Sequence, residues 1–321
     1  MYMDILRSLR AVSEASGTGV VDWAKAGEAA KASTEPGPLD LTPTDRRGYA
    51  ADVRDARTRL RAVAGVAFDV PDTIEVQNRH HWIDANLDTF QNVMGPIEAA
   101  TTAAVPGASR IANTGSMAFA LGFLARNVLG QYDPLLLADD PAADHGLYFV
   151  HPNVVAVAAD LNVEYPRFRR WIAFHEVTHA AEFGAASWLS EYLESRVERG
   201  IDGLTAGGFD RDAFAELQTA MTAVEGYAEL LMDRAFDSEY ADLRRKLDER
   251  RGGGGPVQRL SRRLLGLGLK RQQYERGAAF FERVADERGV DAASAVWDRP
   301  EALPTSREID EPTAWLARVD P

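Results

Sequence analysis

Phe174-His-Glu-Val-Thr-His-Ala-Ala-Glu-Phe183 is the stretch around which the 321-residue sequence is best interpreted. It holds two histidines four residues apart, with a glutamate directly after the first: His175-Glu176-x-x-His179. Positions i and i+4 lie above one another on a helix face, so both imidazoles can bind one metal ion. Imidazole suits zinc, and Glu176 is placed to accept a proton from a zinc-bound water. The stretch therefore predicts a helix that carries a zinc site.

A catalytic zinc needs a third protein ligand and an open position for water. Glu225 and Glu198 are the main possibilities downstream. In glutamate-type zinc peptidases the ligand glutamate often opens a Glu-Gly-aromatic-Ala turn, and Glu225-Gly-Tyr-Ala228 resembles it closely. Glu198 lies among charges typical of a solvated helix face. The predicted metal ligands are therefore His175, His179 and Glu225, with Glu198 and Glu229 as alternatives for the third.

Further side chains are expected around the metal. Glu229 and Asp233 follow Glu225 at one-turn intervals, so their carboxylates are placed to accept the outer N–H of a ligand histidine and fix its tautomer. The oxyanion formed during hydrolysis needs a donor. Tyr227 is included among the predicted catalytic residues for this task, beside three other possibilities: Tyr148, His151 and Tyr192.

Other metal chemistries are less compatible with the sequence. Glu-x-x-His also occurs in di-iron carboxylate sites, but those need two copies, and Glu176-Val-Thr-His179 is the one copy present. The chain has no cysteine, which excludes disulfides, cysteine nucleophiles, thiolate zinc sites and iron–sulfur clusters.

The chain is acidic. Aspartate and glutamate total 49 against 36 for lysine and arginine, giving a net charge of −13. Such a charge disfavours broad binding to nucleic acid or anionic membranes. The start of the sequence shows no signal peptide, and no apolar run reaches the roughly 20 residues of a membrane span. We therefore expect a cytoplasmic protein with neither nucleic acid nor membrane as partner; the oligomeric state is left open.

The hydrophobic pattern predicts a mainly α protein with a small β-sheet, an α+β fold. Strands are expected at residues 134–138 and 146–151, the latter as an edge able to pair with an extended substrate. Residues 1–321 are expected to form a single domain, interrupted by a flexible glycine-rich loop at 252–255. The expected helices are residues 45–64, 73–100 (ended or kinked at Pro96), 112–129, 166–179, 187–199, 210–236 and 256–288.

The chain resembles a prokaryotic family of zinc-dependent hydrolases with a zincin-like core, one branch of which is associated with biosynthesis of a deazaflavin coenzyme. The resemblance extends from about Val21 to Val319. One departure concerns Tyr227, where many relatives have histidine. The matching segments are Val21-Asp-Trp23, Arg79-His-His-Trp82 with Asn86, Val128-Leu-Gly-Gln-Tyr-Asp133, Phe149-Val-His-Pro-Asn153, Trp171-Ile-Ala-Phe-His-Glu-Val-Thr-His179, Glu225-Gly-Tyr-Ala228 with Met232-Asp233, Lys270-Arg-Gln-Gln-Tyr274, Val296-Trp297, Leu303-Pro304 and Trp315.

Two functions follow as hypotheses. The first is a zinc-dependent metallohydrolase of the glutamate type (gluzincin), acting on a peptide or amide substrate through a zinc-bound water that Glu176 activates. The second is a non-catalytic, metal-stabilised scaffold or partner-binding protein linked to coenzyme metabolism, because the family resemblance implies a zinc site rather than a particular reaction.

Overall fold

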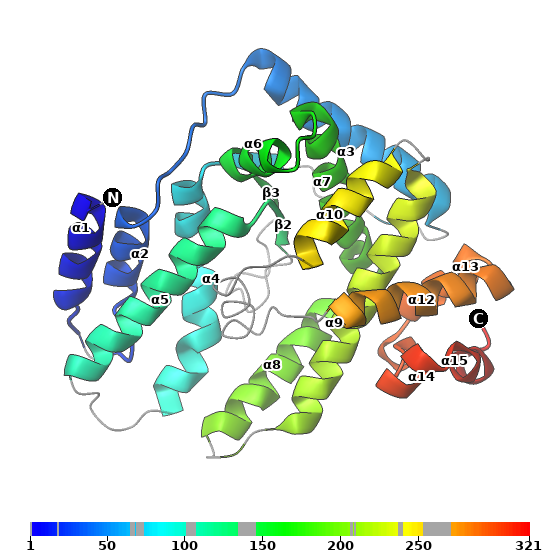
Figure 1. The fold of residues 1–321 in the computed structure, drawn as a ribbon. Coiled ribbons are helices and arrows are strands. Elements are labelled where there is room, and N and C mark those ends of the chain that lie inside the picture. The colour runs from blue at the N-terminus through cyan, green and yellow to red at the C-terminus, as the bar shows by residue number, and fades with distance from the viewer. Residues whose placement is uncertain are drawn as a thin grey trace. The chain divides into compact units, whose positions relative to one another are not determined.

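The computed structural model describes residues 2–17, 19–64, 68, 74–100, 107–133, 146–205, 208, 210–236, 240–252 and 271–321. Within these ranges the chain is mainly helical, and three short strands form a sheet (Figure 1). The predicted α+β class is confirmed. None of the helices in the described ranges combines the length and hydropathy that a bilayer crossing requires.

The elements follow one another along the chain as shown by the colours of Figure 1. Those of the first half are α1 Tyr2–Ser13, α2 Trp23–Ala32, α3 Pro43–Val63, β1 Ile74–Gln77, α4 Arg79–Ala100, α5 Gly107–Asn127, β2 Gly130–Asp133, β3 Gly146–Val150 and α6 His151–Asp160. Those of the second half are α7 Tyr165–Ala185, α8 Leu189–Thr205, α9 Arg211–Ala235, α10 Ala241–Gly252, α12 Arg271–Arg288, α13 Val290–Ser294, η2 Ala295–Trp297, η3 Pro300–Ala302, α14 Ser306–Asp310 and α15 Pro312–Val319.

The chain divides into two compact units, each made of segments distant in sequence. Unit 1 comprises Met1–Leu41, Thr73–Val157 and Glu198–Asp210. Unit 2 comprises Thr42–Asp72, Ala158–Val197 and Arg211–Pro321. Helices α6 and α8 each cross a boundary between these segments. The expected single domain therefore stays a prediction.

The sheet of unit 1 corrects one expectation about β3. The strand order is β1-β3-β2, with β1 parallel and β2 antiparallel to β3. Strand β3 is therefore central, and its backbone groups pair on both sides. It is not the free edge that the sequence suggested for substrate pairing, because Ile74–Gln77, predicted as the start of a helix, forms a strand along it.

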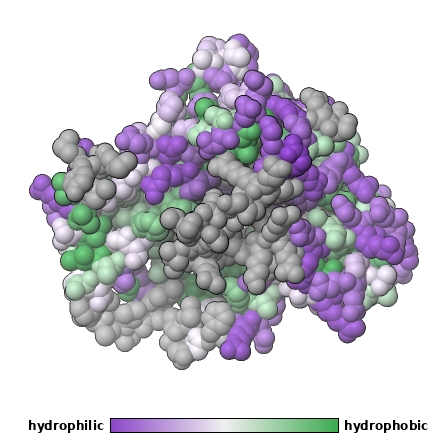
Figure 2. All heavy atoms as spheres, viewed as in Figure 1, coloured by the Kyte–Doolittle hydropathy of each residue, from purple (hydrophilic) through white to green (hydrophobic). Residues whose placement is uncertain are grey.

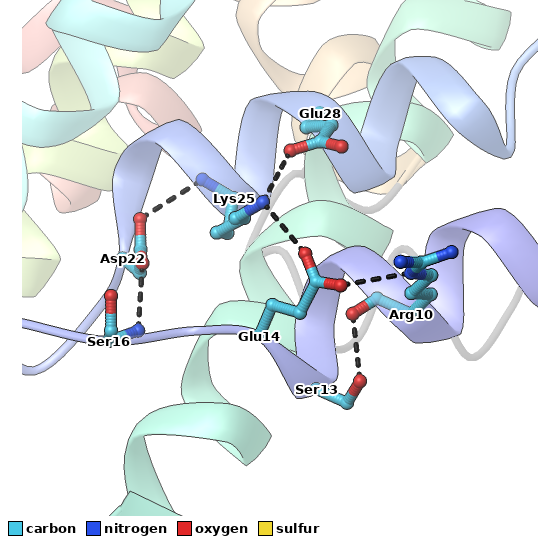
Figure 3. Close-up of polar contacts among 7 residues, drawn as sticks. All are labelled: Arg10, Ser13, Glu14, Ser16, Asp22, Lys25 and Glu28. Atoms are coloured by element: carbon cyan, nitrogen blue, oxygen red, sulfur yellow. Dashed lines mark hydrogen bonds and ion pairs between the residues drawn. The ribbon is translucent and has the colours of Figure 1, made fainter.

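Helices α1, α2, α4 and α5 pack together in unit 1. Their shared core includes Trp82, Ile83 and Leu121, all almost fully buried. At the surface, Lys25 Nζ of α2 lies 3.2 Å from an oxygen of Glu14, the residue that follows α1, and 2.9 Å from an oxygen of Glu28 on its own helix (Figure 3). The Lys25–Glu14 pair ties the end of the first helix to the second.

Unit 2 is built around α7 and α9, which contact each other and α3. Helix α12 packs on α9 at a point where both helices have glycine (Figure 1). A Cβ added to Gly226 would lie 2.4 Å from the carbonyl carbon of Gly277, so only glycine allows this approach. The C-terminal elements complete the core with Trp297 and Trp315, both buried.

Most of the predicted helices are found with shifted ends, with one clear error. The helix expected at 73–100 begins only at Arg79, and it continues through Pro96 to Ala100. Of the helix expected at 256–288, residues 256–270 lie outside the described residues, and α12 covers the rest. The strand expected at 134–138, and residues 253–255 of the glycine-rich loop, lie outside the described residues. Hydrophilic residues cover much of the face drawn in Figure 2, as the charge of −13 leads one to expect.

Candidate metal centre

Helix α7 carries the predicted zinc motif and is buried on nearly all sides. Phe168, Ile172, Phe174 and Val177 are almost inaccessible to solvent. A helix that is buried all round shows no simple amphipathic pattern, which is why its neighbours could not be inferred from its sequence alone. Pro166 lies in its first turn, where the missing N–H costs no helical hydrogen bond.

Two ion pairs anchor the first turns of α7 to α3. Arg169 Nε lies 2.6 Å from Asp52 Oδ2, and Arg170 Nη2 lies 2.6 Å from Asp55 Oδ2. The Arg169–Asp52 pair is nearly buried, so loss of one partner would leave an uncompensated charge in the interior. These pairs hold the first turns of α7 against α3 and thereby help to position the histidines further along the helix.

The two histidines of the motif face each other with Glu225 beside them. His175 Nε2 and His179 Nε2 lie 3.2 Å apart, and ligand atoms of His175, His179 and Glu225 all lie within 4.8 Å of one another. Two ligands on a tetrahedral zinc with bonds of about 2.05 Å are separated by about 3.3 Å. The donors are two imidazole nitrogens and one carboxylate, a common zinc set. The residues present therefore fit zinc in chemistry and in spacing.

Packing and hydrogen bonding orient both rings. The His175 ring stacks on Trp171, with centroids 5.6 Å apart and planes 7° apart. His179 Nδ1 donates a hydrogen bond of 2.9 Å to Glu182 Oε2. Because Glu182 holds a proton on Nδ1, Nε2 is the nitrogen that has the lone pair when the ring is neutral, and this nitrogen is the one that faces His175. Glu182 thus selects the tautomer that a metal requires.

The electrostatic field at His179 favours a cation. Burial lowers the pKa of His179, but the bond to Glu182 and three nearby carboxylate charges outweigh burial and raise this pKa to about 10. The three carboxylates are those of Glu182, Glu225 and Glu176. Glu182 is fully buried, and burial raises its own pKa to about 7 in spite of His179. A site that stabilises an imidazolium without metal also stabilises a divalent cation.

Glu176, the predicted base, is 7% exposed and acts electrostatically on His179. It is thus a nearly buried carboxylate within electrostatic range of His179.

Tyr227 has a different environment from the one its predicted oxyanion role requires. Its hydroxyl donates to the carbonyl oxygen of Ala64 at 2.9 Å and lies 2.7 Å from Ser294 Oγ. Its ring packs against Phe281 and Trp297, and the side chain is 1% exposed. These contacts favour a packing role for Tyr227 over that of oxyanion donor.

Glu229 and Asp233 share one basic partner. Arg244 of α10 forms ion pairs with both carboxylates, at 3.0 Å from Glu229 Oε2 and with Asp233 Oδ1. Their predicted contact with the outer N–H of a ligand histidine stays a prediction, whereas Glu182 bonds directly to His179.

The other residues considered from the sequence are placed as follows. Tyr192 lies under the Arg196 guanidinium, whose carbon is 3.6 Å from the ring centroid. Tyr148 lies on β3, and His151 is nearly buried at the start of α6. Glu198 lies on α8; the group of possible metal ligands among the described residues includes Glu225 and neither Glu198 nor Glu229.

Comparisons with known proteins agree with this geometry. The model of the zincin-like metallopeptidase family matches residues 21–208 and 204–316, which is most of the chain. The chain belongs to the zincin-like metallopeptidase family. It is also similar to a crystal structure from Chloroflexus aurantiacus described as a proposed hydrolase with a novel fold, at 31% identity and a TM-score of 0.74 over 99% of this chain and 98% of that one. No curated protein matches the chain.

The zincin-like site contains one functional residue that the sequence argument missed. Glu182 follows His179 by three residues and lies one turn further along the same helix. The i, i+3 spacing was a signal for this contact, since a short helical step brings a carboxylate next to an imidazole. The more distant Glu229 and Asp233 were chosen instead.

Proposed function

We propose that this zincin-like protein is a zinc-dependent hydrolase of a peptide or amide bond, with His175, His179 and Glu225 as metal ligands and Glu176 as general base. The observation that supports it most is the 3.2 Å approach of the two Nε2 atoms with the Glu225 carboxylate beside them. Family membership supports the hydrolase class. Zinc in this site would supply Lewis acidity and a water of lowered pKa.

The chain's own residues have separate tasks in this proposal. Glu182 holds the His179 tautomer, and Trp171 supports the His175 ring. Glu176 accepts the proton of the attacking water and later donates it to the leaving amine.

The test separates metal binding from turnover. Glu176→Gln keeps the size of the side chain and all three ligands, so we expect one zinc per chain and a loss of hydrolysis of about 100-fold or more. Zinc content is measured by elemental analysis, and hydrolysis with a peptide and amide library. Glu164→Gln, at the start of the same helix where no side-chain cap bond forms, is the control that keeps both. Full activity of Glu176→Gln would contradict the proposal.

A second function is favoured by the packing of Tyr227. Because its hydroxyl bonds to Ala64 and Ser294, Tyr227 is poorly placed to stabilise an oxyanion. A metal-stabilised scaffold, serving a partner in coenzyme metabolism, would need no such donor. In that case His175→Ala lowers the unfolding temperature, and no member of the library is hydrolysed by wild-type protein. Hydrolysis by wild type that is abolished in Glu176→Gln excludes the scaffold.

A further inference from the structure

Unit 1 holds a basic pocket of about 870 Å³. It is bordered by α1, the end of α2 with the segment after it, the start of α4 and the end of α5, which are found together in Figure 1. The volume is within the range of small-molecule sites. Four basic side chains line it, with Glu35 as the acidic one: Arg7, Lys31, Arg79 and Arg126.

The basic side chains of the pocket differ in whether a described acidic residue pairs with them. Lys31 is neutralised by Asp84, at 2.6 Å. Arg79 and Arg126 form no ion pair within the described part of the chain, although they are close enough for the charge of Arg79 to act with burial in lowering the pKa of Arg126. Glu35 offsets the charge of Arg79 from a distance without an ion pair. Two like charges are thus held near each other and partly out of water, at a cost in stability.

Neutral groups hold Arg79 in place. Its Nε donates to Asn153 Oδ1 at 2.7 Å, and its Nη1 donates to the Glu35 carbonyl at 3.1 Å. Asn153 is in turn fixed by its bonds to the carbonyls of Ala125 and Val128 at the end of α5. Among the described residues, the Nη2 of Arg79 makes no hydrogen bond.

Arg126 is held in the same manner from the other side. Its Nη1 donates to the Ser33 carbonyl at 3.2 Å and to Thr34 Oγ1 at 2.8 Å. Its Nε and Nη2 have no partner in the described ranges. Both arginines are therefore positioned by neutral acceptors, which do not cancel the positive charge. Each also has N–H groups that make no hydrogen bond to a described residue.

The backbone between the two arginines is fixed as well. Gly37 has a φ of +73°, and a Cβ there would lie 2.4 Å from Pro152 Cβ. A Cβ on Gly122 would lie 2.9 Å from Thr34 Oγ1. Only glycine allows the approach at Gly37, and Gly122 leaves room for the Thr34 hydroxyl, so the wall of the pocket that carries Ser33 and Thr34 is set by close packing.

We propose that this pocket binds a small molecule through a phosphate monoester group held between Arg79 and Arg126. Two guanidinium groups that form no ion pair with a described residue match a dianion, whereas a carboxylate would neutralise only one of them. Free N–H groups on both side chains offer forked donors to the phosphate oxygens. The Thr34 hydroxyl accepts from Arg126 and has its own proton left to donate. The pocket exceeds the size of a phosphate, which leaves room for the organic part of the ligand.

The test is calorimetric titration of the full chain with phenyl phosphate, inorganic phosphate and benzoate at constant ionic strength. We expect phenyl phosphate to bind, and benzoate to bind at least tenfold more weakly because it carries one charge. Tighter binding of phenyl phosphate than of inorganic phosphate supports an organic monoester, and equal binding overturns that part. Absence of binding by phenyl phosphate overturns the proposal as a whole.

Variants locate the site. Arg126→Gln is expected to weaken phenyl phosphate binding at least tenfold. Arg110→Gln is the matched control, because Arg110 is on the same helix and also donates to a backbone carbonyl, that of Gly19, but does not line the pocket. If Arg126→Gln does not fold, Arg79→Lys keeps the charge and removes the fork, and a weakening of several-fold is expected. An equal loss of phenyl phosphate binding in Arg110→Gln would contradict the proposal. A loss of binding in His175→Ala would contradict it as well, because the anion would then bind at the metal centre.

Discussion

His179 has two polar neighbours, Glu182 and His175, and each lies next to a different ring nitrogen. Glu182 accepts a hydrogen bond from Nδ1–H, and Nε2 faces His175 Nε2 at 3.2 Å. The remaining oxygen of Glu182, Oε1, has no hydrogen-bond partner among the described residues although it is buried. A buried carboxylate oxygen without a hydrogen bond costs stability. The hydrogen bond of the other oxygen to His179 gives the carboxylate a role that offsets this cost.

Replacing Glu182 tests this role. Glu182→Leu keeps the site apolar and removes the acceptor, so zinc affinity is expected to fall about 10- to 100-fold. Glu182→Gln retains an acceptor without the charge and is expected to lie between Leu and wild type. Affinity is measured by competition with a chromophoric chelator, with Glu164→Gln as control. Equal affinity in all four proteins would show that Glu182 does not position the ligand.

His175, Glu176 and His179 were predictable because local helical spacing brings them together. Glu225 lies on another helix and was predicted from the resemblance of Glu225-Gly-Tyr-Ala228 to a zinc-peptidase segment; His175, His179 and Glu225 lie together in the structure. The ion pairs of Glu229 and Asp233 were not predictable, because their partner Arg244 lies on a third helix, α10. For the same reason Tyr227, which looks accessible next to a ligand, is buried by residues that follow α12.

At the scale of elements, the packing of α9 on α12 explains part of the Glu225-Gly-Tyr-Ala228 segment. Gly226 follows the predicted ligand, and its backbone contacts Gly277. The segment therefore combines the proposed metal ligand, a contact between helices and a buried aromatic ring. The glycine-to-glycine contact also links the position of Glu225 to that of α12.

A methyl group placed in this contact is expected to be destabilising. A Cβ on Gly277 would lie 2.3 Å from the Thr222 carbonyl oxygen, so Gly277→Ala should lower the free energy of unfolding by about 1–3 kcal/mol. Gly200→Ala, on α8 with no atom within 4 Å of the added Cβ, should instead be neutral or stabilising by up to about 1 kcal/mol. Urea unfolding of both variants checks this, and a similar effect of the two substitutions would contradict it.

Helix α14 supplies a pH-dependent contribution to stability. Glu308 caps this helix with Thr305 and pairs with Arg318 at 2.6 Å. Burial raises the pKa of Glu308, but the bonds to Arg318 and Thr305 outweigh it and lower the pKa below its ordinary value. A carboxyl group whose folded pKa is depressed stabilises the fold above its unfolded pKa, and that stability is lost as pH falls through the folded value.

Glu308→Gln should therefore cost about 1 kcal/mol of unfolding free energy at pH 7, and progressively less below pH of about 4.5. Urea unfolding at pH 7 and pH 4 measures the difference, with Glu301→Gln on the neighbouring η3 as control. If the difference in unfolding free energy between wild type and Glu308→Gln is larger at pH 4 than at pH 7, the predicted direction of the pH dependence is wrong.

Strand β1 shows why some elements cannot be predicted from local sequence alone. Ile74–Gln77 is only four residues long, and its alternation of β-branched residues merges with the helical pattern that follows at Arg79. It is a strand because β3 pairs with it in parallel, a contact between segments about 70 residues apart that local sequence does not encode. Long helices such as α3 and α9 were predicted to within a few residues because their own periodicity defines them.

At the scale of the molecule, the chain passes repeatedly between unit 1 and unit 2, and α6 and α8 each belong to both. Because a helix loses its hydrogen bonds cooperatively, neither unit can unfold fully without disrupting these two helices. We expect one calorimetric transition in which the calorimetric and van't Hoff enthalpies agree. Two resolved transitions would show that the expected single domain is wrong.

The position of zinc is the central claim, and anomalous diffraction at the zinc absorption edge tests it most directly. The account predicts one anomalous peak at about 2.0–2.2 Å from His175 Nε2, His179 Nε2 and a Glu225 carboxylate oxygen. Its intensity should vanish in crystals of His175→Ala. A zinc-replete crystal with no peak at these three residues, or with Glu198 or Glu229 in place of Glu225, would contradict the account.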